Sequence, residues 1–208
     1  GQIEDARQRF EELLKYKQHW IVYRGLFFAA QAKGDSEAMR RYGASAMAAP
    51  GELKAKVNFL AQLAGALENM GSYDKEAYEH YLLAKLIRTE QNWKISPQLI
   101  AKVDSYDYSP ADRPELLRRL QSFWMAEKHA GEEQHTGTID KILPGGKAGF
   151  IREYGGGQYY FRTASLYRVR AQEGEKVTFY VEDFFDINKK KPARRAVDIE
   201  PVLLYHKK

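Results

Sequence analysis

Apolar residues recur at helical spacing over the first 130 residues, at steps of three and four positions. The clearest apolar stripes occupy residues 3–14, 20–30, 59–67 and 77–84. Gly34-Asp35-Ser36 interrupts the pattern, and its Asp or Ser can cap a helix that begins near Glu37. Asp112 starts a last stripe, which runs to Trp124. The pattern predicts an all-helical N-terminal part in which this last helix closes the stack.

An internal repeat lies within this helical part. The turns at Gly34 and Gly71 are 37 residues apart, and a small residue followed four positions later by Tyr comes after each of them. The two small-residue and tyrosine pairs are Ala38 with Tyr42 and Ala77 with Tyr81. This repeat resembles the tetratricopeptide repeat, a helix–turn–helix unit of roughly 34 residues. The resemblance implies an array suited to holding a protein partner, and self-association or a spacer role stays open.

After His135 the period of the pattern changes to two. Alternating segments bounded by glycine-rich turns occupy residues 138–142, 149–152, 158–162, 176–182 and 193–199. Five short strands within about 65 residues predict a small closed barrel. The expected layout is therefore an α + β two-domain chain, with a helical-repeat domain at 1–130, a polar linker at 131–135 and a β-barrel at 136–208.

The barrel region resembles the cold-shock domain, a family with the OB-fold. The resemblance is carried, in order and spacing, by four segments: 137–151, 159–166, 174–179 and 191–197. They match the family's first hairpin, its second nucleic-acid strand, its G-x-x-V-x-F fourth strand, and its final loop and strand. In this family, aromatic side chains on neighbouring strands stack on the bases of single-stranded nucleic acid.

The resemblance places Phe150 and Tyr160 at stacking positions and Arg162 where the family has a histidine. Lys141, Ala148 and Thr163 stand where aromatic residues are usual, so only part of the stacking platform is present. A planar guanidinium can still stack on a base. Phe150 also fits a barrel core. The full candidate interface comprises Lys141, Lys147, Phe150, Arg152, Tyr160, Arg162, Lys189, Lys190, Lys191, Arg194 and Arg195.

Alternation in segment 158–162 predicts which side chains face inward. If Tyr160 and Arg162 share the outer face of this strand, then Tyr159 and Phe161 face the other way. The larger apolar pair should fill the barrel core. Tyr160 and Arg162 then remain available to a ligand.

The net charge of +5 is concentrated at the C-terminal end. Residues 1–135 contain 19 basic and 19 acidic side chains, whereas residues 136–208 contain 14 basic and 9 acidic ones. Clustered cations of this kind favour a phosphate backbone because binding releases counterions. A solubilising loop is the simpler interpretation of the basic cluster at 189–195.

No pattern in the sequence indicates catalysis. There is no cysteine, the five histidines lack metal-ligand spacing, and Gly155-Gly156-Gly157 is not followed by a helix that could hold phosphate. All three tryptophans, at positions 20, 93 and 124, fall in helical apolar patterns and are expected to pack in a core. We expect no enzyme activity, no cofactor and no bound metal. The absence of cysteine and of a membrane-spanning or signal segment favours a cytoplasmic protein.

The sequence thus predicts a non-enzymatic adaptor that binds single-stranded nucleic acid, RNA more readily than DNA, through its barrel. Its helical repeats would hold a protein partner or a second copy of the chain. One alternative is a protein-interaction module whose barrel has lost nucleic-acid binding. Another is an accessory region of a larger multidomain protein, which the absence of an initial Met permits.

Overall fold

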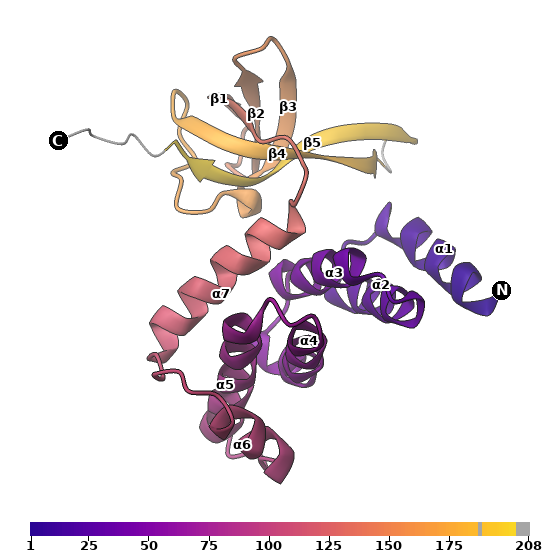
Figure 1. Cartoon of the computed structure of the whole chain (residues 1–208). Coiled ribbons are helices and arrows are strands. Elements are labelled where there is room, and N and C mark those ends of the chain that lie inside the picture. Colours follow the sequence, from indigo (N-terminus) through magenta and orange to yellow (C-terminus); the bar gives the residue numbers. More distant parts are fainter. Residues whose placement is uncertain (187–188, 203–208) are drawn as a thin grey trace. The chain divides into compact units, whose positions relative to one another are not determined.

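A computed structural model describes residues 1–186 and 189–202 and has an α + β layout (Figure 1). The chain divides into two compact units, Gly1–Ala130 and Gly131–Lys208. The first unit holds seven α-helices and a 3-10 turn, and the second a five-stranded sheet and a 3-10 turn. Residues 203–208, the end of the predicted barrel domain, lie outside the described residues.

The bounds of the helices are α1 Gln2–Leu14, α2 Trp20–Lys33, α3 Ser36–Ala48, η1 Leu53–Lys56, α4 Val57–Asn69, α5 Asp74–Glu90, α6 Pro97–Asp104 and α7 Arg113–Lys128. Helices α2, α3, α6 and α7 begin where the sequence supplies a side-chain cap. The Asp35 carboxylate accepts a hydrogen bond from the Ala38 backbone N–H at 3.0 Å, and Asp112 accepts one from Glu115 at 2.9 Å. The predicted cap at Asp35 is thereby confirmed, and Asp112, predicted only as the start of the last helix, also acts as a cap.

Helix α6 was not predicted from the periodicity. It has a single buried stripe of two residues, Leu99 and Val103, which is too short to show a period. The Ser96 hydroxyl nevertheless accepts a hydrogen bond from the Leu99 N–H, and Pro97 opens the helix. The prediction for Trp93 was wrong: it lies in the turn before α6 and 41% of it is exposed.

Large apolar side chains fill the core of the helical unit. Helix α2 packs against α3, α4 packs against α5, and α7 covers both α3 and α5. Gly43 allows the close approach of α3 to α4, because a Cβ at this position would lie 2.5 Å from Leu63 Cδ1. The fully buried side chains include Leu26, Phe27, Phe59, Leu60, Leu63, Leu67, Leu83, Ile87 and Leu116.

His80 and Trp124 form a buried hydrogen bond between α5 and α7. The Trp124 Nε1–H can only donate, and it donates to His80 Nε2 at 2.8 Å. His80 Nδ1 therefore carries the proton, which it donates to the Glu76 backbone carbonyl at 2.6 Å. Complete burial lowers the pKa of His80 from 6.5 to about 4. A neutral imidazole thus joins the two helices.

Lys56 is also buried, with only 2% of its surface exposed. Its Nζ donates to the backbone carbonyl of Met47 at 3.0 Å and to that of Ala49, at the C-terminal end of α3. Desolvation lowers the pKa of Lys56 from 10.5 to about 8. This lysine satisfies carbonyl groups that the helix end leaves without an intrahelical partner.

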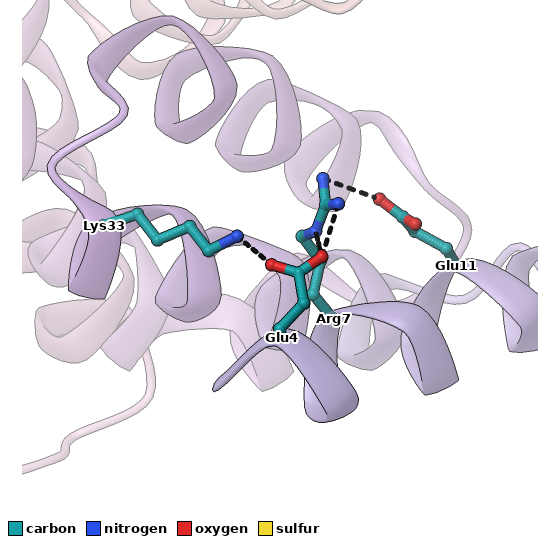
Figure 2. A network of polar contacts seen from close by, with 4 residues as sticks. All are labelled: Glu4, Arg7, Glu11 and Lys33. Atoms are coloured by element: carbon teal, nitrogen blue, oxygen red, sulfur yellow. Dashed lines mark hydrogen bonds and ion pairs between the residues drawn. The ribbon is translucent and has the colours of Figure 1, made fainter. Parts of the chain in front are cut away.

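Helix α1 contacts the rest of the helical unit through a few side chains and contains no buried residue. The Phe10 ring covers Gly25 of α2, where an added Cβ would lie 2.4 Å from Phe10 Cζ. Figure 2 shows the polar part of the contact, in which the Glu4 carboxylate accepts hydrogen bonds from Arg7 and from Lys33 of α2. Arg7 also pairs with Glu11 at 3.4 Å. The predicted apolar stripe of α1 is therefore only partly covered.

The second unit is a sheet that closes into a ring in the strand order β1-β2-β3-β5-β4. Its strands are β1 His135–Ile142, β2 Ala148–Glu153, β3 Gln158–Arg162, β4 Lys176–Asp186 and β5 Lys191–Pro201. All pairings are antiparallel except β3–β5, which is parallel and has Tyr160 opposite Arg195. Toward the turn that connects them, β4 is four residues longer and β5 is two residues longer than the sequence predicted.

The ring encloses a small apolar core. Its buried members are Ile139, Ile151, Phe161, Val177, Phe179, Ala196 and Ile199. Phe161 is completely buried and Tyr159 packs against the core, which confirms the predicted alternation in β3. Tyr160, between them in the chain, therefore faces outward.

Within the described part of the chain, none of the helices combines the length and the apolar character needed to cross a membrane.

Candidate nucleic-acid interface

Four of the candidate residues form one row across the outer face of the sheet. Lys141 of β1 lies opposite Phe150 of β2, Phe150 lies opposite Tyr160 of β3, and Tyr160 lies opposite Arg195 of β5. Directly opposed residues point to the same side of a sheet. The set Lys141, Phe150, Tyr160 and Arg195 is called the outer row below.

Two aromatic rings stand at the centre of the outer row. The centroids of Phe150 and Tyr160 are 6.0 Å apart and the ring planes meet at 70°. Both side chains are partly buried, and neither belongs to the core. The core interpretation of Phe150 is therefore wrong.

Gly149 explains how the rings come to lie outside. Gly149 is opposite Phe161 across β2–β3, and a Cβ on it would lie 2.7 Å from the Phe161 ring. The absent side chain leaves room for Phe161 to fill the core against the backbone of β2. Phe150 is the next residue in β2, so alternation turns it outward beside Tyr160.

Arg152 lies on the same face but is already paired. The register of β1 against β2 shifts between Ile139 and Lys141, and Asp140 is the extra residue at this irregularity. The Asp140 carboxylate accepts two hydrogen bonds from Arg152, at 3.1 and 3.0 Å, and one from Gln158 at 2.9 Å. Hydrogen bonding to Arg152 is the main reason that the pKa of Asp140 lies below its usual value. The charge of Arg152 is thus largely compensated.

Arg195, at the end of the outer row, is also held by neighbouring side chains. Its Nε pairs with the Glu182 carboxylate of β4, and its guanidinium lies 4.9 Å from the centre of the Phe184 ring. Only 17% of its side chain is exposed. Arg195 therefore presents a fixed guanidinium rather than a mobile cation.

Arg194 does not belong to the outer row. Its guanidinium lies 5.8 Å from the centre of the Tyr159 ring and 3.7 Å from the Asp183 carboxylate. Tyr159 faces the core side of β3, so Arg194 lies on the face of β5 opposite to Arg195. The structure thus separates these two neighbouring candidates.

The remaining candidate cations are exposed, and within residues 1–186 and 189–202 none of them has an ion-pair partner. They are Lys141, Lys147, Arg162, Lys189, Lys190 and Lys191. Arg162 lies opposite Ala148 on the outer face, so the small alanine leaves its guanidinium uncovered. Lys147 precedes β2, and Lys189 to Lys191 lie at the turn between β4 and β5. Lys141 and Arg162 lie beside the two rings on the outer face, whereas Lys189 to Lys191 lie at the far end of β4 and β5.

Phe184, which was not among the predicted interface residues, also belongs to this surface. Phe184 lies two residues after Glu182 in β4, opposite Ala193 of β5, on the face that carries Arg195 and Tyr160. The predicted strand ended at Glu182, so no face could be assigned to Phe184. Its only signal was an aromatic pair, Phe184-Phe185, placed shortly before a run of lysines.

Among the residues that the structure describes, no cluster of three or more His, Asp or Glu side chains could hold a metal ion. His135 is engaged locally, since its Nδ1 lies 2.5 Å from a Glu153 carboxylate oxygen and its ring stacks on Phe179. The residues of the candidate site are therefore aromatic rings and cations.

Comparison with known proteins gives no independent assignment of this surface. No protein-family model matches the chain, and a search of curated proteins finds no significant match.

Proposed function

We propose that this protein is a non-enzymatic adaptor that binds single-stranded RNA, and less readily single-stranded DNA, on the outer row of its C-terminal unit. The observation that carries the proposal is the outward-facing pair Phe150 and Tyr160, with ring centroids 6.0 Å apart. The resemblance of segments 137–151 and 159–166 to the cold-shock family of OB-fold barrels supports it. The proposal takes the closed ring to be a barrel of this type.

Single-stranded ligands suit a surface of this kind. Bases that are not paired can leave their neighbours and stack on aromatic rings, and each such contact contributes roughly 1–3 kcal/mol regardless of base identity. A duplex keeps its bases stacked internally and offers no such faces. Two rings and the uncovered guanidinium of Arg162 provide stacking surfaces for two or three bases.

The positive charges add a contribution to the binding affinity that does not depend on base identity. Six exposed candidate cations lack an ion-pair partner among the described residues, so they remain available to phosphate groups. Arg152 and Arg195 are already bound by Asp140 and Glu182, and we assign them to positioning rather than to phosphate binding. Affinity should consequently depend strongly on salt.

The helical unit is proposed to hold a protein partner or a second copy of the chain. The exposed apolar side chains of α1 and of the start of α2 support this part of the proposal. Ile3, Leu13 and Ile21 are each 45 to 52% exposed. Sedimentation velocity of the full chain over a range of concentrations tests self-association. A monomer at every concentration would exclude self-association, and a different protein would then be the proposed partner.

Anisotropy of labelled oligo-U and oligo-dT tests the nucleic-acid proposal. Tyr160→Ala should weaken oligo-U binding by about 1–3 kcal/mol, because one stacking surface is lost. Tyr167→Ala is the matched control, since Tyr167 is an exposed tyrosine of the same unit that lies outside the outer row. Wild-type protein that binds neither oligonucleotide at low salt would refute the proposal and favour a protein-interaction module.

A further inference from the structure

Strands β4 and β5 continue beyond the ring as a two-stranded arm. β4 pairs with β1 only through residues 176–179, and β5 meets β3 at Arg195. From Asp183 opposite Arg194 to Asp186 opposite Lys191, the two strands pair only with each other within the described part of the chain. In Figure 1 these strands run past the ends of β2 and β3. Residues 182–186 and 189–195 are called the β4–β5 arm below.

One face of the arm continues the outer row. Because side chains alternate along each strand, Phe184 lies on the same face as Glu182, and Lys191 lies on the same face as Arg195. The Phe184 ring contacts the Arg195 guanidinium, whose centre is 4.9 Å from the ring centroid. Arg195 is itself opposite Tyr160. A continuous surface therefore leads from Phe150 through Tyr160 and Arg195 to Phe184.

The apolar core does not account for Phe184. Phe184 is partly buried and is neither a member of the sheet's core nor packed against it. Its cross-strand partner Ala193 is small and covers little of the ring, whereas the Arg195 guanidinium lies against it. An aromatic ring in such a place on a two-stranded ribbon provides a surface on which a planar group can stack.

The charges of this end of the arm suit a polyanion. Lys189, Lys190 and Lys191 are exposed, and the Asp186 carboxylate beside them accepts a hydrogen bond from the Lys189 backbone N–H at 3.1 Å. Asp183, whose side chain is 88% exposed, lies on the opposite face with Arg194. The face that carries Phe184 ends at Lys191 opposite Asp186, and the exposed Lys189 and Lys190 follow in the turn.

We infer that Phe184 is a further stacking residue for the single-stranded RNA that the proposed function assigns to the outer row, and that the arm guides the strand from Tyr160 toward Lys189–Lys191. The inference rests on that proposed function. Phe184 is two strand spacings across and two residues along from Tyr160, on the order of 12 Å by ordinary sheet dimensions. The intervening Arg195, fixed by Glu182, lies under the path of the strand.

Equilibrium binding of a labelled oligo-U of about 10 nucleotides, within the site size of one OB-fold, to the full-length chain tests the inference. Phe184→Ala should weaken binding roughly tenfold, and Phe184→Leu should weaken it to a similar extent, because leucine keeps the apolar volume without the ring. Phe185→Ala is the matched control on the opposite face of the arm and should change the affinity less than twofold. Circular dichroism melting of each variant checks that the fold is retained.

Two results would overturn the inference and leave the proposed function intact. The first is wild-type affinity in Phe184→Ala while Tyr160→Ala is weakened. The second is loss of binding in Phe184→Ala with full binding in Phe184→Leu, which would assign Phe184 to packing only. If Phe184→Ala alters melting, cross-linking of a 4-thiouridine oligonucleotide to the wild-type chain decides: adducts in residues 183–191 support the inference, and adducts confined to β2 and β3 contradict it. An oligonucleotide that does not bind the wild type at all would instead refute the proposed function.

Discussion

Lowering the pH from about 7 to about 4.5 is expected to destabilise the helical unit through His80. The buried imidazole accepts the Trp124 N–H at Nε2, so a second proton on the ring would break this hydrogen bond and place a charge in the core. The pKa of His80 is about 4 in the folded chain and 6.5 in an unperturbed histidine. The unfolded chain therefore binds this proton first as the pH falls.

The magnitude follows from linkage between protonation and folding. The pKa of His80 is lower in the folded chain than in the unfolded chain. The contribution of His80 to the free energy of unfolding is therefore complete above pH 6.5 and is lost as the pH falls toward 4. One pKa unit corresponds to about 1.36 kcal/mol, so the loss between pH 7 and 4.5 is about 2.5 kcal/mol. This is a large part of the usual stability of a domain of this size.

Urea unfolding followed by circular dichroism at 222 nm measures the free energy of unfolding at each pH. His80→Gln lacks the titration, so the difference between the wild type and this variant should shrink by about 2.5 kcal/mol between the two pH values. Taking the difference removes the contributions of other titrating groups, including Glu79, whose pKa is raised by burial and which acts in the opposite direction. Parallel pH profiles for the two proteins would refute the reasoning.

Three further predictions concern the core, the salt dependence and the buried lysine. Phe161→Ala should lower the free energy of unfolding by about 3–5 kcal/mol, because the ring is fully buried, and Phe150→Ala should lower it far less in the same urea titration. The plot of log K against log salt for oligo-U should have a slope of roughly −3 to −4, as about four to six phosphates are neutralised, and a flat plot would contradict electrostatic binding. Lys56 has a pKa of about 8 in the folded chain and 10.5 when unperturbed, so the folded chain releases this proton first and stability should rise with pH between these values. Urea midpoints at about pH 8 and pH 10 should therefore differ more in the wild type than in Lys56→Met.

The coarse layout and several local features could be predicted from the sequence because neighbouring residues determine them. Asp35 and Asp112 cap helices through hydrogen bonds to backbone N–H groups three residues away. The alternation of Tyr159, Tyr160 and Phe161 fixes the two faces of β3 in the same local way. The resemblance to tetratricopeptide repeats and to cold-shock domains stays a prediction.

The sequence could not predict which cations form ion pairs, because the pairing depends on strand register. Arg152 is compensated by Asp140, which faces it only because the pairing of β1 with β2 shifts at that residue. Arg195 is fixed by Glu182, a cross-strand neighbour 13 positions away in the chain. Phe184 was missed for a related reason, since a ribbon without a core beneath it shows no clear alternation of apolar and polar residues.

The way the ring closes has a consequence for how the two units fold. The helical unit is built largely from helices that follow one another in the chain, whereas the ring is completed by β1 with β4 and by the parallel contact of β3 with β5. Contacts between distant parts of a chain form slowly, because the intervening loop loses entropy before the contact stabilises it. We expect the helical unit to acquire its structure first and the sheet to follow on a slower timescale. Since Tyr160 meets Arg195 at the closing contact, the complete outer row would exist only after this last step.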